Sequence, residues 1–204
     1  MTIVTGVTVR VPAKLNLQLA VGPPRADGYH DLVTVFHAVS LFDEITAEPA
    51  GRDGITVTGE GADRVPADRD NLALRAVTAL RAVALSASGV HITIAKRIPV
   101  AAGLAGGSGD AAAALVACNE LWNGRLGQPH LLEIAARVGS DVAFALLGGT
   151  AARSAATARS ARLSWSAGTR SAPSPLTVIP SRPAGSAVIS SNSETAWNTV
   201  TRSW

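Results

Sequence analysis

The sequence predicts an α+β domain in which helices cover one face of a β-sheet. Three observations favour this class. Apolar residues alternate through much of the first 60 residues, three stretches after residue 70 have helical character, and one more alternating stretch lies between the first two of these. With 47% hydrophobic and 16% charged residues, the chain has enough apolar side chains for a buried core. We expect this domain to occupy residues 1–150.

Strands are expected first along the chain, because apolar and polar residues alternate there. The predicted strands are residues 7–11, 15–21, 33–39, 45–47, 55–58 and 90–94. Leu72, Ala76, Leu80 and Val83 are spaced to lie on one side of a helix over residues 71–85.

Two further helices are predicted over residues 108–122 and 128–138. Ser108 should cap the first of them, with Asp110 in the turn where a negative charge is favourable. The single cysteine, Cys118, falls inside that helix, where we expect a buried thiol.

Composition changes after Thr150. Residues 151–204 consist mainly of Ser, Ala, Thr, Arg and Pro, without sustained apolar periodicity, which predicts a low-complexity tail that is disordered or read in a shifted frame. This tail also carries the basicity behind the net charge of +3, because the preceding residues form no Lys and Arg stripe. The charge pattern therefore argues against nucleic-acid binding.

A membrane protein is also not expected. No run of about 18 apolar residues is present, and the first residues lack a basic segment followed by an apolar block. These observations predict a soluble, cytoplasmic protein, and they leave the oligomeric state open.

The most informative segment is PVAAGLAGGSGDAAAA, residues 99–114, which leads from a strand through a glycine-rich turn into a helix. Its backbone amides and the helix N-terminus are suited to bind phosphate. It does not match the P-loop, since the residue directly before Ser108 is Gly107 and not lysine. It does not match the G-x-G-x-x-G dinucleotide pattern either. The alternative is a glycine-rich connection packed tightly against a neighbouring helix.

Lysine is rare in this chain, which has Lys14 and Lys96 against 16 arginines. Lys14 interrupts an alternating strand, and Lys96 precedes the glycine-rich turn. Since lysine supplies a compact point charge that arginine does not, both positions are candidates for a site.

Four segments together resemble the GHMP kinases. They are PAKLNL (residues 12–17), ADGYHDL (26–32), PVAAGLAGGSGDAA (99–112) and GSDVAF (139–144). The resemblance covers residues 7–150 and implies the ribosomal-S5-like fold of the family's N-terminal domains. It also implies ATP and Mg²⁺ as cofactors. The second segment resembles family members that phosphorylate the 2-hydroxyl of a cytidine diphosphate-linked methylerythritol in non-mevalonate isoprenoid synthesis.

The resemblance implies a role for each matching residue. Asp141 would be the general base, with Lys14 beside it, and Asn16, Tyr29 and His30 would bind the substrate. Ser108 would hold Mg²⁺ or a phosphate. The nucleotide would lie against Asn71, Lys96, Pro99, Val100, Ala101, Ala102, Gly103, Leu104, Ala105, Gly106, Gly107, Ser108 and Gly109.

Simpler structural roles remain open for several of these residues. Asp141, Asn71 and Ser108 could each cap a helix, Lys14 could extend its ammonium to solvent from a strand, and Tyr29 and His30 could belong to a turn. Ala105 and Gly109 depart from the usual residues of the family's glycine motif.

The sequence is also consistent with other functions. In the family the cleft lies between two domains, and here no kinase-like second domain follows Thr150. The chain could therefore be an impaired kinase or a non-catalytic nucleotide-binding remnant. It could also be a GHMP kinase for another small alcohol.

Overall fold

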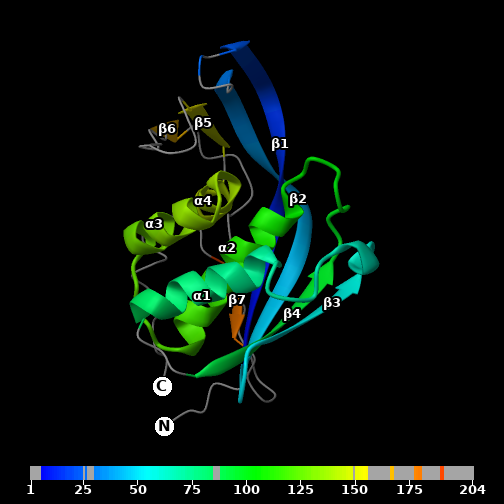
Figure 1. Cartoon of the computed structure of the whole chain (residues 1–204), viewed down its shortest axis with the longest axis vertical. Helices are drawn as coiled ribbons and strands as arrows, with labels where there is room; N and C mark the ends of the chain where they lie inside the picture. Colours follow the sequence, from blue (N-terminus) through cyan, green and yellow to red (C-terminus); the bar gives the residue numbers. More distant parts are fainter. Residues whose placement is uncertain are drawn as a thin grey trace.

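A long antiparallel ribbon organises the computed structural model. Strand β1 (Val7–Pro24) pairs with β2 (His30–Ala50) along almost its whole length. The outer part of the ribbon projects beyond the body of the domain as an arm (Figure 1). The structure describes residues 6–24, 26, 30–84, 88–148, 150–155, 166–167, 177–180 and 189–190.

The ribbon is the centre of a larger sheet with the order β3-β4-β2-β1-β7-β8. Strand β3 (Gly54–Gly59) is parallel to β4 (Gly89–Lys96), because the connection between them crosses over through a helix. A second branch joins β5 (Thr150–Ala155) to the arm part of β2. The short strands are β6 (Ser166–Ala167), β7 (Thr177–Pro180) and β8 (Ile189–Ser190).

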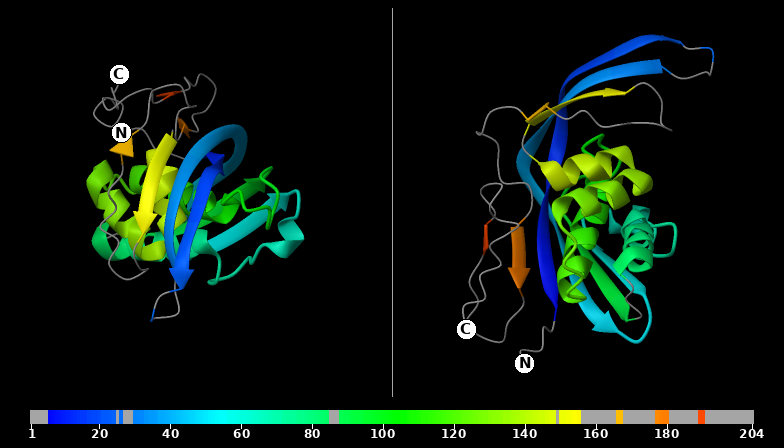
Figure 2. Two further views of the ribbon diagram at one scale, coloured as in Figure 1. Left: turned by 90° about the horizontal axis from the view of Figure 1, so that it is seen from above. Right: turned by 90° about the vertical axis from the view of Figure 1, so that its left-hand side faces the viewer.

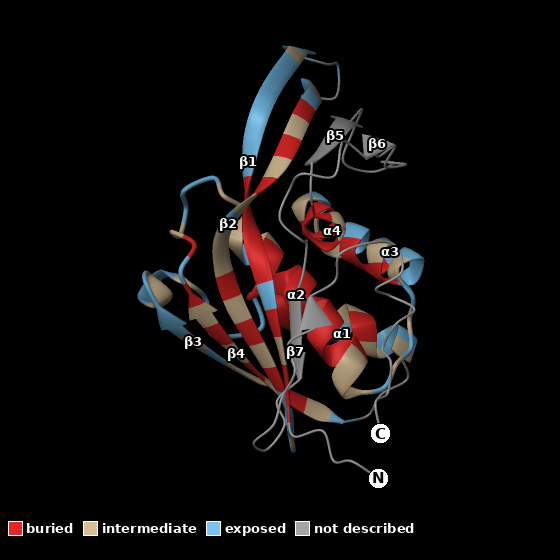
Figure 3. Ribbon diagram, turned by 180° about the vertical axis from the view of Figure 1, so that it is seen from behind, coloured by how far each residue is buried: buried red, intermediate tan, exposed pale blue. Residues whose placement is uncertain are grey.

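Four α-helices lie on one face of this sheet (Figure 2). They are α1 (Leu72–Ala84), α2 (Gly106–Leu121), α3 (Gln128–Val138) and α4 (Ser140–Leu147), and a short 3-10 helix, η1 (Ala62–Arg64), precedes α1. Figure 3 shows that α2 is the most deeply buried of the four. Every residue of α2 from Gly109 to Asn119 is buried, so this alanine-rich helix forms the core between the sheet and the other helices.

The predicted fold class is confirmed, but the predicted strands were too short. Residues 7–11 and 15–21 belong to one strand, because register shifts at Pro12/Ala13 and Asn16/Gln18 absorb the break in alternation without ending the pairing. Residues 33–39 and 45–47 likewise belong to β2.

The predicted start of α2 was wrong. The helix begins at Gly106, and its N-cap is Ala105 in the left-handed conformation, with φ 57°. Ser108 therefore lies inside the first turn and does not cap the helix. A left-handed residue turns the chain into the helix here, whereas we had expected a side-chain cap.

The predicted tail falls largely outside the described residues. Within the described part, β5 begins at the expected boundary of residue 150 and extends the sheet. The boundary itself and the proposed disorder of residues 151–204 stay predictions. None of the described helices is long and apolar enough to cross a membrane.

Candidate active site

The glycine-rich turn forms one wall of a pocket of about 470 Å³ between β4, α1 and α2. All of the residues predicted to bind nucleotide, except Gly109, line this pocket. Its walls are Arg64, Val65, Pro66, Asp70, Asn71, Leu72, Lys96, Pro99, Val100, Ala101, Ala102, Gly103, Leu104, Ala105, Gly106, Gly107, Ser108 and Asp110.

Left-handed backbone shapes this turn at three positions. Ala101, Gly103 and Ala105 have φ values of 63°, 73° and 57°. Only glycine adopts this conformation without a steric penalty, so the two alanines are strained. The turn leads into α2, whose backbone ladder begins with the Gly109 amide donating to the Ala105 carbonyl at 2.9 Å. The three preceding amides, of residues 106–108, lie at the pocket and are the groups that a helix N-terminus offers to an anion.

Gly109 plays a different part from the one expected. It does not line the pocket, and its amide is used within α2. A Cβ built on Gly109 would lie 3.1 Å from Val11 Cγ2. The residue lets α2 pack closely against β1.

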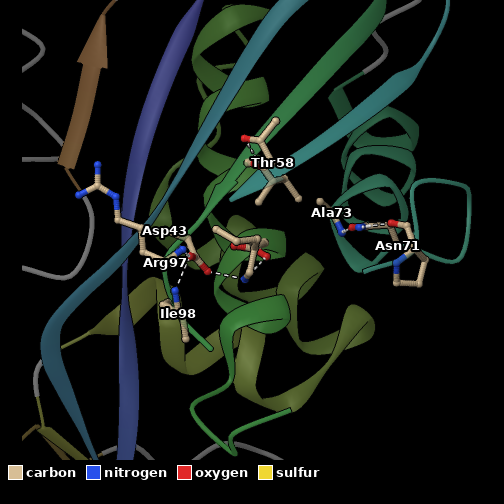
Figure 4. Close-up of polar contacts among 10 residues, drawn as sticks. Asp43, Thr58, Asn71, Ala73, Arg97 and Ile98 are labelled. Atoms are coloured by element: carbon tan, nitrogen blue, oxygen red, sulfur yellow. Dashed lines mark hydrogen bonds and ion pairs between the residues drawn. The ribbon is translucent and has the colours of Figure 1, made fainter. Parts of the chain in front are cut away.

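Asn71 both caps a helix and lines the pocket. Its Oδ1 accepts the Ala73 amide at 2.9 Å, and its Nδ2 donates to the Pro66 carbonyl at 2.7 Å (Figure 4). The side chain thus joins the start of α1 to the segment before it, and its exposure is only 5%.

Lys96 lies in a buried charge cluster that sequence reasoning missed. Its Nζ forms ion pairs with Asp43 Oδ2 and with Asp110 Oδ2, the second at 2.8 Å. Asp43 Oδ1 also accepts the amides of Arg97 and Ile98, at 2.6 and 2.8 Å (Figure 4). Although Lys96 lines the pocket, its ammonium is therefore engaged by two carboxylates.

Burial controls the ionisation of this cluster. It raises the pKa of the Asp110 carboxyl to about 7, against the lowering effect of the Lys96 ammonium. Burial also opposes the charge on Lys96, but the carboxylates of Asp110 and Asp43 outweigh it, so the pKa of Lys96 is raised. Asp110 Oδ1 is buried and has no hydrogen-bond partner in the described structure.

A second group of predicted residues meets at the base of the arm. Lys14 Nζ lies 3.7 Å from Asp141 Oδ2, in the first turn of α4, and donates to Asn16 Oδ1 at 2.7 Å. The ammonium also lies 4.5 Å above the ring centroid of Phe36, whose ring contacts Phe144. A buried aromatic pair thus supports a lysine side chain that is only 10% exposed.

Asn16 and Thr34 extend this polar group along the arm. Asn16 Nδ2 donates to Thr34 Oγ1 at 2.8 Å, and that hydroxyl donates to the Gln18 carbonyl at 2.8 Å. The network fixes the amide of Asn16 toward Lys14. Thr34 is buried, and it was not singled out from the sequence.

One backbone hydrogen bond connects the two groups. The Lys14 amide donates to the Leu104 carbonyl at 3.1 Å, and Leu104 lines the pocket. The residue that carries the ammonium beside Asp141 is thereby attached to the pocket wall.

The remaining predicted substrate residues lie in the arm. His30 is exposed at the start of β2, and its Nδ1 donates to the Gly22 carbonyl at 2.7 Å. Tyr29 lies outside the described residues.

Comparison with known proteins identifies the family of this fold. The family model described as "GHMP kinases N terminal domain" matches residues 71–149. The 4-diphosphocytidyl-2-C-methyl-D-erythritol kinase of Thermobifida fusca is 59% identical over 155 residues, and that of Streptomyces coelicolor is 60% identical over 147. These alignments cover 72% and 71% of this chain but only 50% and 49% of the two relatives. The chain thus spans about half the length of the curated relatives that it matches.

Solved structures give the same result. A crystal structure of 4-(cytidine 5'-diphospho)-2C-methyl-D-erythritol kinase superposes with a TM-score of 0.63 at 38% identity, covering 78% of this chain and 55% of that one. A homoserine kinase from Cytophaga hutchinsonii, at 19% identity and a TM-score of 0.60, shares the fold and covers 82% of this chain and 53% of its own. Residues 71–149 therefore carry the N-terminal domain of the GHMP kinases, and the described body has the fold of that domain.

Proposed function

We propose that this chain supplies the nucleotide-binding and proton-accepting half of an ATP-dependent kinase. Its acceptor is the 2-hydroxyl of 4-diphosphocytidyl-2-C-methyl-D-erythritol, an intermediate of non-mevalonate isoprenoid synthesis. The observation that carries the proposal is the attachment of the Lys14–Asp141 pair to the pocket wall, through the Lys14 amide and the Leu104 carbonyl. A phosphate site and a carboxylate base are the two parts that phosphoryl transfer to an alcohol requires.

In this reaction the acceptor oxygen attacks the γ-phosphorus of ATP. A new O–P bond forms, the bond from that phosphorus to the β-phosphate oxygen breaks, and ADP leaves. Asp141 accepts the proton of the hydroxyl, because its side chain is 32% exposed and can reach a bound alcohol. The Lys14 ammonium stabilises the negative charge that develops on the attacking oxygen.

The pocket is suited to the phosphate chain. The amides of residues 106–108 and the positive end of the α2 dipole favour negative charge there. Asn71, just before α1, and Lys96, at the end of β4, line the same pocket and would lie toward the adenine end.

Magnesium would be held mainly by the phosphates, with the Ser108 hydroxyl as the protein ligand. The described residues contain no group of three or more acidic, His or Cys side chains that could hold a metal ion, and Mg²⁺ in kinases commonly keeps phosphate and water ligands. When bound, the ion neutralises charge on the transferred phosphoryl group.

The arm would bind the acceptor substrate. Asn16 would orient the acceptor beside Lys14, while Tyr29 and His30 would bind the cytosine by stacking and by polar contacts. Because ATP is the donor, we place the reaction in the cytoplasm. The alignments cover only about half the length of the relatives that support this substrate, so a second domain would complete the cleft.

Two measurements on this chain test the proposal. Calorimetry with ADP and Mg²⁺ reports binding in the pocket, and ADP release in the presence of the cytidyl substrate reports turnover. Binding together with turnover that Asp141→Asn abolishes supports the kinase, whereas binding without turnover supports a non-catalytic remnant.

The substrate is tested separately through Tyr29→Ala. If cytosine stacks on this ring, the variant loses about 1–3 kcal/mol of substrate affinity, by analogy with base stacking on aromatic side chains. Unchanged affinity would point to a GHMP kinase for another small alcohol.

A further inference from the structure

The buried cluster of Asp43, Lys96 and Asp110 takes no part in the chemical step proposed above, although Lys96 and Asp110 line the nucleotide pocket. The side chains are 0%, 2% and 2% exposed. Burying three ionisable groups is costly unless each finds good partners, and a buried ion pair adds little net stability over well-packed apolar residues. Its place beside the pocket suggests a task other than stability.

We propose that this cluster sets the position of the phosphate-binding amides of the glycine-rich turn, with Asp43 as a positioning residue. The inference rests on the proposed function, since residues 106–108 are the amides assigned there to the phosphates. It gives Lys96 a task that differs from contact with adenine.

Asp43 holds the start of the turn. Its Oδ1 accepts two successive amides, those of Arg97 and Ile98, immediately before the turn begins at Pro99. Its Oδ2 accepts a hydrogen bond from Lys96. Because Asp43 lies in β2, these bonds attach the entry of the turn to a central strand of the sheet (Figure 4).

Lys96 extends the attachment to the end of the turn. The same ammonium that pairs with Asp43 donates to Asp110 Oδ2 at 2.8 Å, in the second turn of α2. The Lys96 ammonium thus connects Asp43, which accepts the amides of Arg97 and Ile98, with Asp110 in α2. Lys96 holds Asp110 Oδ2, whereas the other Asp110 oxygen has no hydrogen-bond partner in the described structure.

Gly106 makes this arrangement possible. A Cβ built on it would lie 2.9 Å from Lys96 Nζ and 3.2 Å from Ile98 Cγ2. A Cβ on neighbouring Gly107 would meet nothing within 4 Å. The ammonium therefore packs directly against Gly106, whose amide is one of the three assigned to the phosphates.

The first test is Gly106→Ala, which keeps every charge and adds one methyl group beside Lys96 Nζ. We expect the Kd for ADP, measured by calorimetry at a temperature where the variant is folded, to rise at least tenfold. The same substitution in a Lys96→Ala background should have a much smaller effect, because the ammonium that it displaces is gone. Equal effects in the two backgrounds would show that the methyl group acts through Ile98 or on the ligand itself, and would overturn the inference.

The second test is Asp43→Asn, which keeps an oxygen for the two amides but removes the charge that holds Lys96. We expect weaker ADP binding by about tenfold in the folded protein. The matched control is Asp53→Asn, which breaks an ion pair with Arg81 that does not line this pocket, and which should lower the melting temperature without changing the Kd.

Each result is decisive. If the wild-type chain binds ADP and both Gly106→Ala and Asp43→Asn bind it equally well, the cluster only stabilises the fold and the inference is wrong. If Asp43→Asn does not fold, the Gly106→Ala pair of measurements decides alone. If the wild-type chain does not bind ADP, the proposed function itself is wrong. This result differs from equal binding by the wild type and the variants, which would refute only the positioning role of the cluster.

Discussion

Lys14 Nζ lies 3.7 Å from Asp141 Oδ2, although these residues come from opposite ends of the domain. Lys14 follows the first register shift of β1, and Asp141 lies in the first turn of α4. The bulge redirects the strand so that the ammonium faces α4 and the Phe36 ring, and the start of a helix favours the carboxylate. The pair is therefore positioned by local features of two separate elements.

Replacing this carboxylate tests its catalytic role. We expect Asp141→Asn to lower kcat by a factor on the order of 10²–10⁴, the range that a positioned general base contributes. The Kd for ADP should stay the same, because Asp141 does not line the nucleotide pocket. ADP release and calorimetry measure the two quantities, and unchanged turnover would remove Asp141 from the mechanism.

Gly109 provides a test of packing. Its missing side chain leaves α2 close to Val11, so Gly109→Ala forces a methyl group to 3.1 Å from Val11 Cγ2. Overpacking of this kind costs about 1–3 kcal/mol, which urea unfolding would measure. Gly107→Ala, with open space around its Cβ, is the control and should be no less stable than the wild type. Equal losses in both variants would contradict the assignment of Gly109 to packing.

Ala105 provides a test of backbone strain. With φ at 57°, this alanine occupies a conformation that costs about 1–2 kcal/mol for a residue with a Cβ. Ala105→Gly should therefore raise the free energy of unfolding by about 1 kcal/mol, after the greater flexibility of glycine in the unfolded chain is counted. Ala102→Gly, where φ is not positive, should instead be destabilising. A loss of stability in Ala105→Gly would argue against strain in the turn.

The Arg81–Asp53 pair predicts a specific pH dependence. Hydrogen bonds from Arg81, at 2.5 and 2.6 Å, hold the pKa of Asp53 below its ordinary value of 3.8. A depressed carboxyl pKa adds stability that is present above the ordinary pKa and is lost as the pH falls through the lower, folded-state pKa. Above about pH 5, the free energy of unfolding of the wild type should thus exceed that of Asp53→Asn by a constant amount. For a partly exposed pair this amount is about 1 kcal/mol or less.

Below pH 4 that difference should shrink, as denaturant unfolding across pH 2–7 would reveal. A difference that grows on acidification would have the wrong sign for a lowered pKa and would contradict the role given to Arg81.

Local patterns predicted much of this protein. Helix α3 has the predicted bounds, and α1 and β4 differ from theirs by one or two residues, because their apolar periodicity is strong and uninterrupted. The resemblance to the GHMP kinases also implied that Lys14 lies beside Asp141, and the structure places the two side chains together. The interruptions were interpreted wrongly: residues 12–14 were predicted to separate two strands, yet a β-bulge at Pro12/Ala13 keeps the pairing intact.

The charge cluster could not be predicted for a different reason. Asp43 lies in a strand among apolar residues, and nothing near it in sequence indicates that its partners are Lys96 and Asp110, which are 53 and 67 positions away. The cluster forms only because the sheet places β2 beside β4, and no local sequence pattern indicates this pairing. Gly109 was misassigned for a related reason, because a glycine that allows close packing and one that binds phosphate look alike in sequence.

The proposed kinase requires that nucleotide phosphates bind at the turn between β4 and α2. Backbone amide NMR shifts of the wild-type chain during titration with ADP and Mg²⁺ test it most directly. We predict that the largest saturable shifts belong to residues 103–108, with smaller ones at Asn71 and Lys96. Shifts confined to the other described pocket, which Asp53 and His91 line, or no saturable change at the turn, would contradict the account.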